Sequence, residues 1–539
     1  MAKGKVWLVG AGPGDAELLT KKAERVLNTA DVIVYDALVG QAVIAGLPET
    51  AEKVYVGKRS SHHAMPQEEI SRLLVSYAER GKNVVRLKGG DPFLFGRGGE
   101  EIEELLAGGI DYEVVPGITS ALAVPAYNGI PVTHRDYCSS LHIITGHKRR
   151  GKSLELDYEA LCRMEGTLVF LMGVASAPEI CHGLIAAGMD PQMPVALLSQ
   201  GTTAGQQRLV STVAELPRRM EKEKLPTPAI LLIGKVCALA EDFCWYERLP
   251  LAGTRVVLTR PKQRMQRLAE KFRSLGAEVL EFPSIQICPI KGTEKDRAQE
   301  NFRTGKIILA SQEKGEEADG VCQELFRALA QIETYQWLVF TSPSGIDVFF
   351  EQCAEVKFDI RRLSSLKIAV IGSGTARQLE QHGIYADLLP EEYSAAALGE
   401  ALAKKTGKQD RILIARAEAG SPDLLARLQK DICHSVDDIA IYRTEVVDRT
   451  LENVGRDRQA LEELATDERA VFVFTSASTV RGTVDNMSPE ALARMRAVCI
   501  GEQTAKEAGR YGIAVQVAEQ ADEESLVEAV VKRAAVKKN

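Results

Sequence analysis

Short apolar runs alternate with longer amphipathic stretches along the whole chain. Buried strands are predicted within residues 5–10, 30–35, 228–234 and 255–261, each followed by a turn or a helix-like stretch. This alternation is typical of α/β units with largely parallel sheets. A break in the pattern at 245–253 predicts two parts, 1–246 and 252–539.

The second part contains an internal repeat. The run 337–345 returns as 470–478, and the run 368–376 returns as 497–505. The spacing is too long for a solenoid and fits two homologous α/β lobes. Each run ends in hydroxyl-bearing or glycine-rich residues, at the carboxyl ends of strands, where open α/β sheets bind ligands.

Composition narrows the class of protein. The net charge of −7 argues against a general nucleic-acid binder, and no apolar stretch is long enough for a membrane span. Ten cysteines are scattered without a Cys-x-x-Cys pair, which predicts reduced thiols in a cytoplasmic protein and no metal site. The highly charged stretch 291–320 is interpreted as a solvated insertion.

Two glycine-rich turns follow predicted strands in the first part, at 10–14 and 89–99, and a third strand-to-helix turn at 116–120 ends in hydroxyl-bearing residues. Asp36 lies at the end of the next strand after the first turn, which suggests a nicotinamide site. However, the spacing is G-x-G-x-G, and Pro13 removes an amide from the turn, so this alternative is weak. In the second turn, Asp91 beside two glycines is suited to accept hydrogen bonds from a ribose or an ammonium group.

Together with the motifs at 56–59, 129–135, 145–147, 167–173 and 200–206, these turns resemble the S-adenosylmethionine-dependent tetrapyrrole methylases, most closely uroporphyrinogen-III C-methyltransferase. The resemblance covers essentially all of 5–240. It implies a two-lobed fold, S-adenosylmethionine as methyl donor, S-adenosylhomocysteine as product, and a homodimer through this half. The chain departs from the family at Ala204-Gly205, where a proline is expected.

The resemblance also implies individual site residues. Asp36 and Lys58 take the acid/base positions, and Asp36 is a reasonable base for the proton lost around methyl transfer. The implied cofactor residues are Pro13, Gly89, Gly90, Asp91, Leu94, Thr119, Ser120, Met172 and Gly201. Because the tetrapyrrole substrate is rich in carboxylates, we expect a basic rim drawn from Arg59, Arg86, Arg97, His134 and Arg135.

The second part has no Ser-His-Asp or Cys-His pattern and no P-loop. Its repeat, with the motifs at 258–261 and 439–444, resembles uroporphyrinogen-III synthase over about 254–535. The resemblance implies two flavodoxin-like α/β lobes joined by a two-stranded ladder, with lobe one at 254–286 plus 444–539 and lobe two at 288–441. It makes Tyr442 the catalytic hydrogen-bond donor, and the implied substrate contacts are Thr341, Ser342, Thr475, Ser476 and Thr504.

The leading hypothesis is a bifunctional enzyme of tetrapyrrole biosynthesis. The second half would cyclise hydroxymethylbilane to uroporphyrinogen III with inversion of the last ring. The first half would then methylate the product twice to give precorrin-2 for siroheme or cobalamin. The alternative is a methyltransferase whose second half is a non-catalytic, tetrapyrrole-sensing module. Neither reading involves nucleic acid or a membrane.

Overall fold

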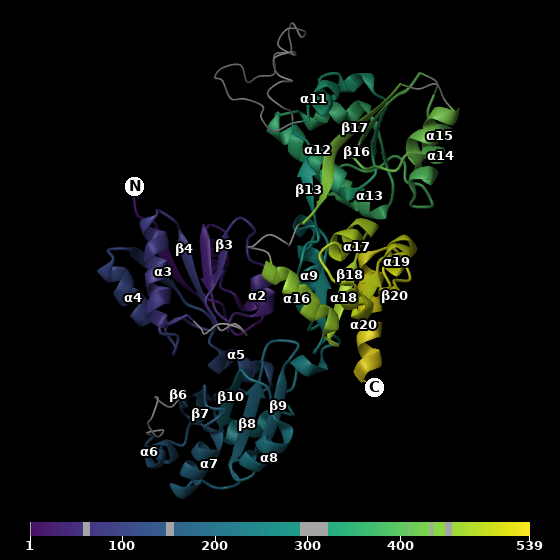
Figure 1. The fold of residues 1–539 in the computed structure, drawn as a ribbon. Helices are drawn as coiled ribbons and strands as arrows, with labels where there is room; N and C mark the ends of the chain where they lie inside the picture. Colours follow the sequence, from purple (N-terminus) through teal and green to yellow (C-terminus); the bar gives the residue numbers. More distant parts are fainter. Residues whose placement is uncertain are drawn as a thin grey trace. The chain divides into compact units, whose positions relative to one another are not determined.

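The computed structural model describes residues 2–57, 65–146, 156–291, 322–407, 409–431, 435–447 and 455–538 (Figure 1). These residues form four five-stranded sheets, which confirms the predicted α/β class. The chain divides into two compact units, 1–283 with 448–539, and 284–447. Among the described residues, no helix has the length and apolar character needed to cross a bilayer.

The first sheet is fully parallel, in the order β3-β2-β4-β1-β5. Its strands are β1 (Lys5–Gly10), β2 (Val32–Tyr35), β3 (Glu52–Tyr55), β4 (Val84–Lys88) and β5 (Asp111–Val115). Helices α1 (Lys21–Leu27) and α2 (Gln41–Ala45) pack on one face, and α3 (Gln67–Glu79) and α4 (Gly98–Ala107) on the other. Because both faces are covered, β2 and β4 are buried throughout.

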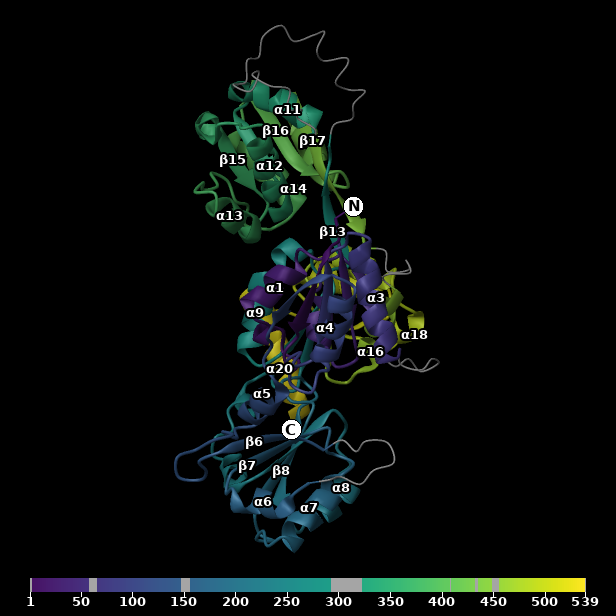
Figure 2. The same ribbon diagram turned by 90° about the vertical axis from the view of Figure 1, so that its left-hand side faces the viewer.

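The second sheet is mixed, in the order β6-β7-β10-β8-β9. Only β6 and β7 pair in parallel. Its strands are β6 (Leu141–Thr145), β7 (Thr167–Leu171), β8 (Pro194–Ser199), β9 (Gln207–Thr212) and β10 (Ala229–Ile233). Figures 1 and 2 show α5 (Ser120–Tyr127) on one face and α6 (Tyr158–Arg163), α7 (Ala177–Ala186) and α8 (Leu216–Glu223) on the other.

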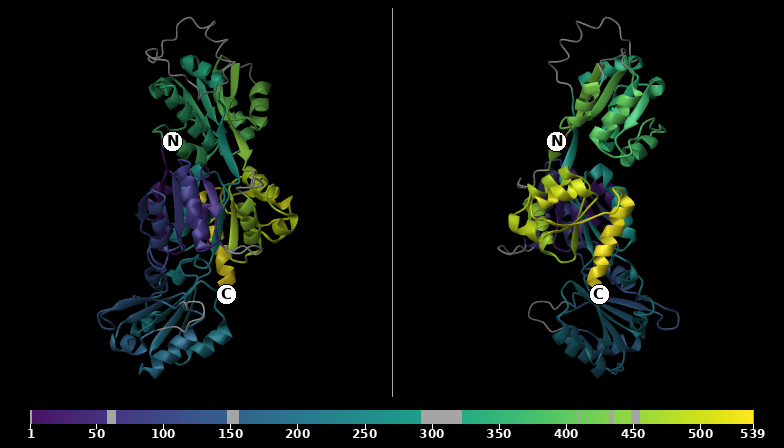
Figure 3. Two further views of the ribbon diagram at one scale, coloured as in Figure 1. Left: turned by 60° about the vertical axis from the view of Figure 1, so that its left-hand side comes forward. Right: turned by 90° about the vertical axis from the view of Figure 1, so that its right-hand side faces the viewer.

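The third sheet is parallel and discontinuous in sequence, in the order β12-β11-β18-β19-β20. Its strands are β11 (Arg255–Leu258), β12 (Glu278–Glu281), β18 (Ala470–Phe474), β19 (Arg496–Cys499) and β20 (Ala514–Val517). Helices α9 (Gln266–Ser274) and α20 (Glu523–Lys538) pack on one face. The other face carries α16 (Gly455–Thr466), α17 (Ala477–Val484), α18 (Pro489–Arg494) and α19 (Glu502–Gly509), whose later members are yellow in Figure 3.

The fourth sheet forms the second unit, in the order β13-β17-β16-β14-β15. Its strands are β13 (Ile285–Pro289), β14 (Trp337–Phe340), β15 (Lys367–Val370), β16 (Arg411–Ala417) and β17 (Ser435–Val446). Strands β13 and β17 pair in antiparallel fashion, and the other pairings are parallel. Helices α11 (Gln323–Ala330), α12 (Pro343–Glu355) and α13 (Ser373–Glu380) cover one face, and α14 (Ala395–Lys405) and α15 (Asp423–Asp431) cover the other.

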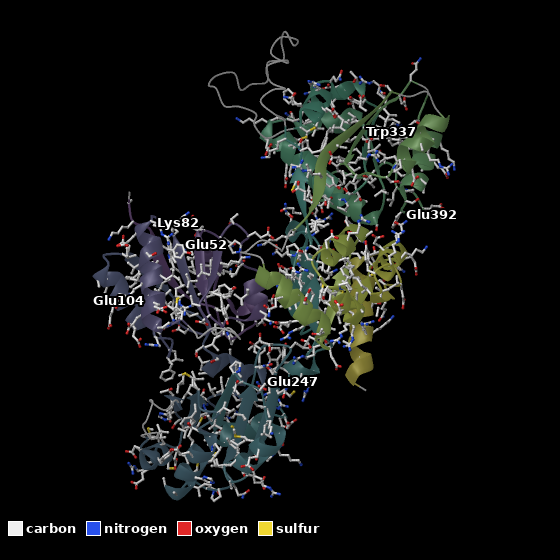
Figure 4. All side chains as sticks on the ribbon, in the orientation of Figure 1. Glu52, Lys82, Glu104, Glu247, Trp337 and Glu392 are labelled. Atoms are coloured by element: carbon white, nitrogen blue, oxygen red, sulfur yellow. The ribbon has the colours of Figure 1, made fainter. Side chains whose placement is uncertain are left out.

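The sequence repeat appears as a structural repeat. Strand β14, which begins at the labelled Trp337 in Figure 4, leads into α12, just as β18 leads into α17. The first helix is capped by Ser342 and the second by Ser476, whose side chains accept hydrogen bonds from backbone amides. The repeated Thr-Ser pair therefore marks a strand end and a helix start in each lobe.

Candidate functional site

The three predicted turns of the first half pack backbone against backbone through their glycines. A Cβ atom on Gly10 would lie 2.5 Å from Cα of Gly117 and 2.6 Å from the carbonyl oxygen of Gly90. Gly12 and Gly90 also exchange backbone hydrogen bonds, of 3.2 and 2.7 Å. Only glycine permits this approach, so the turns that follow β1, β4 and β5 form one tightly joined surface.

Two further segments join this surface. A Cβ atom on Gly89 would lie 2.6 Å from the carbonyl oxygen of Leu38, in the turn after β2. The loop 200–206, called here the 200s loop, reaches the first turn through the Asp15 amide, which donates to Oγ1 of Thr202 at 3.3 Å. Gly201 in this loop packs against Val124 of α5, since a Cβ atom there would lie 2.4 Å from that side chain. The structure thus brings most of the predicted cofactor segments together.

Several predicted cofactor residues also shape these turns. The Asp91 carboxylate accepts hydrogen bonds from the amides of Phe93 at 2.8 Å and Gly117 at 3.0 Å, so it ties the second turn to the third. Thr119 caps α5, which begins at Ser120. Leu94 packs against the apolar cluster beneath α5.

Backbone strain is concentrated in the same segments. Of the eight described non-glycine residues with positive φ, five lie here: Phe95, Arg97, Met172, Gln200 and Thr202. Met172 follows β7 directly and is 52% exposed. Such conformations persist only where the surrounding structure holds them, and they gather at functional sites.

A buried cluster of charges lies under the turns. Arg86 in β4 donates to Oδ2 of Asp36 at 2.8 Å and to Oε1 of Glu101 at 3.1 Å. Lys88 donates to the same Glu101 oxygen at 2.9 Å. Burial, reinforced by the neighbouring Arg86, lowers the pKa of Lys88. One carboxylate, Glu101, therefore connects two cations in β4 with the start of α4.

This cluster changes the role expected for Arg86. Its side chain is only 3% exposed, whereas that of Asp36 is 25% exposed. Arg86 therefore does not stand on a basic rim facing the substrate, because its guanidinium is already bonded inside the lobe. Its contribution to the site runs through Asp36, whose position it fixes.

The other predicted basic residues lie nearer the surface. Arg97 is exposed and pairs with Glu100, and Arg135 is exposed. His134 accepts a hydrogen bond at Nδ1 from the Asp136 amide at 3.2 Å. Lys58 and Arg59 lie outside the described residues.

Exposed apolar side chains lie on the site segments and were not predicted from the sequence. Large apolar residues on the site segments are left open to solvent: Leu38, Phe93, Phe95, Ile118, Leu122 and Met172. Apolar side chains exposed on these segments are available to contact an apolar ligand. The available signal was the pair of phenylalanines inside a glycine-rich stretch, where no core strand or helix is predicted.

In the second unit, the predicted residues Thr341, Ser342 and Tyr442 meet at one end of the fourth sheet. The hydroxyl groups of Ser342 and Tyr442 are hydrogen-bonded at 2.7 Å, and Tyr442 is 5% exposed. Ser342 Oγ also accepts from the Gly345 amide at 3.0 Å. Two of the predicted residues therefore form a direct pair.

The remaining predicted residues lie at the carboxyl end of the third sheet. Thr475 and Ser476 follow β18, and Ser476 forms a capping box with Thr479 at the start of α17. Thr504 is buried in α19. The Ser476 hydroxyl is thus already engaged in ending the strand and starting the helix.

Comparisons with known proteins identify both halves. Residues 5–217 match the family model of tetrapyrrole (corrin/porphyrin) methylases, and residues 320–528 match that of uroporphyrinogen-III synthase HemD. The porphyrin biosynthesis protein HemD of Ruminiclostridium josui is 40% identical over 528 residues, which are 98% of each chain. The chain belongs to the same family as this HemD protein. It is a bifunctional enzyme of tetrapyrrole biosynthesis, as the two sequence resemblances predict.

Other relatives match one half only. The siroheme synthase of Azotobacter vinelandii is 52% identical over 246 residues, which cover 46% of this chain and 53% of that protein. The chain thus spans about half the length of the siroheme synthases that it matches. A uroporphyrin-III C-methyl transferase of Thermus thermophilus, solved with S-adenyl homocysteine, is 42% identical and covers 44% of this chain and all of its own, with a TM-score of 0.38.

Proposed function

We propose that the second half converts hydroxymethylbilane to uroporphyrinogen III and that the first half methylates this product twice to precorrin-2. The proposal is carried by the presence of both family matches in one chain. It is supported by the gathering of the glycine turns into one surface in the first half. Precorrin-2 would supply siroheme or cobalamin synthesis.

The packed glycine turns fit a nucleoside-bearing methyl donor. Side chains are absent where the backbones meet, so amide and carbonyl groups line the surface, and the Asp91 carboxylate lies beside them. When bound, S-adenosylmethionine supplies an electrophilic methyl group on a sulfonium. We assign its binding to Pro13, Gly89, Gly90, Asp91, Leu94, Thr119, Ser120, Met172 and Gly201.

For methyl transfer, the chain's own residues supply position, water exclusion and a proton acceptor. The exposed apolar side chains of Leu38, Phe93 and Phe95 offer a face for the macrocycle, and Arg97 and Arg135 offer charges for its carboxylates. Asp36, held by Arg86, accepts the proton that the substrate loses. Lys58 is the proposed partner in this proton transfer.

For ring closure, the second half needs a hydrogen-bond donor and a clamp. Loss of hydroxide from hydroxymethylbilane is assisted by an O–H donor, and the hydrogen-bonded pair of Tyr442 and Ser342 offers one. Thr341, Thr475, Ser476 and Thr504 are the proposed contacts for substrate carboxylates. The homodimer through the first half and a cytoplasmic location are further proposals, supported by the family resemblance and the scattered thiols.

Each half has its own test with the full chain. Hydroxymethylbilane alone should yield isomer III of uroporphyrinogen above the level of a protein-free control, in which spontaneous closure gives isomer I. Binding of hydroxymethylbilane without this enrichment would favour the sensing-module alternative. Uroporphyrinogen III with methyl-labelled S-adenosylmethionine should yield a labelled tetrapyrrole, and its absence would refute the methyltransferase assignment.

A further inference from the structure

The 200s loop of the first half contacts the third sheet, within the same compact unit. The Ala204 amide donates to Oε2 of Glu278 at 3.0 Å, and both residues are buried. A Cβ atom on Gly205 would lie 3.3 Å from Nη1 of Arg469. Glu278 begins β12 and Arg469 immediately precedes β18. The loop therefore lies at the amino-terminal edge of this sheet.

The acceptor in this contact is rigidly held. Arg255 donates to the same Glu278 oxygen at 2.8 Å and to Asp467 at 2.5 Å. The side chain of Glu278 is 4% exposed, and those of Arg255 and Asp467 are 15% exposed. A carboxylate so placed in a buried ion network keeps its geometry, because leaving any member unpaired is strongly unfavourable.

On its other side, the 200s loop supports the proposed cofactor site. Oγ1 of Thr202 accepts from the amide of Asp15 in the first turn, and the Thr202 amide donates to Oε1 of Gln206 at 3.0 Å. Gln200 and Thr202 have positive φ values of 45° and 68°. Gly201 lies between these two residues. A loop with this strain depends on its surroundings to hold its shape.

The residue at position 204 makes the contact possible. The methylase resemblance leads us to expect a proline at 204–205, and this chain has Ala204-Gly205. A proline has no N–H and cannot donate a hydrogen bond. Residue 204 can donate a hydrogen bond to Glu278 because it is an alanine, which has a backbone N–H, and not a proline.

We propose that Glu278 is a positioning residue for methyl transfer, acting across the boundary between the two halves. Through the Ala204 amide, the third sheet holds the 200s loop, and with it Gly201, in the shape that binds the methyl donor. The contact uses the amino-terminal edge of the sheet, whereas Thr475 and Ser476 lie at its carboxyl-terminal end. The contact that supports the proposed methyl-donor site therefore does not occupy the end of the sheet where the proposed substrate contacts Thr475 and Ser476 lie. The inference rests on the proposed methyltransferase function.

The test compares Ala204→Pro with Ala204→Ser in the full chain. The first variant removes the N–H and the second keeps it. We expect Ala204→Pro to weaken S-adenosylhomocysteine binding about tenfold in calorimetry and to raise KM for S-adenosylmethionine similarly, as loss of a buried hydrogen bond to a charged group does. The kcat of methyl transfer should fall less, and isomer III formation should be unchanged. Ala204→Ser should match the wild type in all four quantities.

Glu278 provides a second, independent arm. Glu278→Ala should weaken S-adenosylhomocysteine binding as Ala204→Pro does, and Glu278→Gln, which keeps an acceptor, should restore part of it. Wild-type affinity in either Ala204→Pro or Glu278→Ala would overturn the proposal, and so would an equal loss in Glu278→Gln and Glu278→Ala. If the wild type itself does not bind S-adenosylhomocysteine, the proposed methyltransferase function fails instead. If Ala204→Pro does not fold, the Glu278 pair decides.

Discussion

The Arg86 guanidinium donates hydrogen bonds to acceptors in three parts of the domain built on the first sheet. Besides Asp36 and Glu101, its guanidinium reaches the carbonyl oxygens of Val34 at 3.4 Å and Leu87 at 2.9 Å. Through these hydrogen bonds, Arg86 links the turn after β2 to the start of α4. A buried cation with these contacts orients Asp36.

Replacing Arg86 with Gln should slow methyl transfer more than tenfold while leaving S-adenosylhomocysteine affinity within about twofold, because Asp36 loses its support and the glycine turns do not. We expect a lower melting temperature as well, since breaking a buried ion pair costs about 3–5 kcal/mol. If Arg86 acts through Asp36, Arg86→Gln should slow an Asp36→Asn enzyme little further. Fully multiplicative effects in the double variant would contradict this role.

Tyr442 offers a cleaner single-atom change. Tyr442→Phe removes only the hydroxyl that is bonded to Ser342. We expect isomer III formation to fall by about 100-fold or more as a hydrogen-bond donor to the leaving hydroxide is lost. The product should shift toward isomer I, as measured by chromatography of the oxidised porphyrins. Methylation of added uroporphyrinogen III is the internal control, and an unchanged isomer ratio would exclude the donor role.

At the level of secondary structure, Ser342 and Ser476 cap equivalent helices in the two lobes. Substitutions of Ser476 can distinguish a capping role from a substrate-binding role. Ser476→Ala should destabilise the start of α17 by about 1 kcal/mol, and Ser476→Asp should retain the cap. If Ser476 also binds a substrate carboxylate, Ser476→Asp should raise KM for hydroxymethylbilane while keeping the wild-type melting temperature. A normal KM in that variant would limit Ser476 to its capping role.

Strand β5 is fastened to its neighbours by Glu113. Hydrogen bonds from Lys22 of α1, at 2.5 Å, and Lys5 of β1, at 2.6 Å, lower the pKa of Glu113 from 4.5 to about 2. A depressed carboxyl pKa stabilises the fold above pH 4.5, and this contribution is lost as the pH falls toward 2. Urea midpoints measured through this range should therefore fall less steeply in Glu113→Gln. Because the Glu113 side chain is partly exposed, high salt should shrink the difference, and identical profiles would contradict the assignment.

Strands were predictable because buried parallel strands form short apolar runs that end in glycine or Thr-Ser. The turn after β4 was predictable because two glycines follow the run of that strand directly. The burial of Arg86 was not, because its neutralising partners Asp36 and Glu101 lie far along the chain in other elements. The contact between Ala204 and Glu278 was likewise hidden, since it joins residues of two different halves.

In the whole molecule, the third sheet is assembled from two separate stretches of the chain. Its strands β11 and β12 precede the second unit in sequence, and β18 to β20 follow it. The first half of the chain ends beside this sheet, since the Tyr246 hydroxyl donates to the carbonyl oxygen of Gly276, just before β12, at 3.1 Å. The next residue, Glu247, labelled in Figure 4, accepts from Gln206 of the 200s loop at 2.9 Å. Because the net charge of the chain is −7, its overall field does not attract anionic substrates. Substrate capture therefore depends on local cations and backbone amides.

The most direct test of bifunctionality is a single incubation of the full chain with hydroxymethylbilane and S-adenosylmethionine, followed by chromatographic separation of the isomers and mass spectrometry of the tetrapyrroles. We expect a dimethylated tetrapyrrole of the isomer III series and two equivalents of S-adenosylhomocysteine for each tetrapyrrole formed. Omission of S-adenosylmethionine should leave unmethylated uroporphyrinogen III. Accumulation of unmethylated uroporphyrinogen III in the complete mixture, or of isomer I alone, would contradict it.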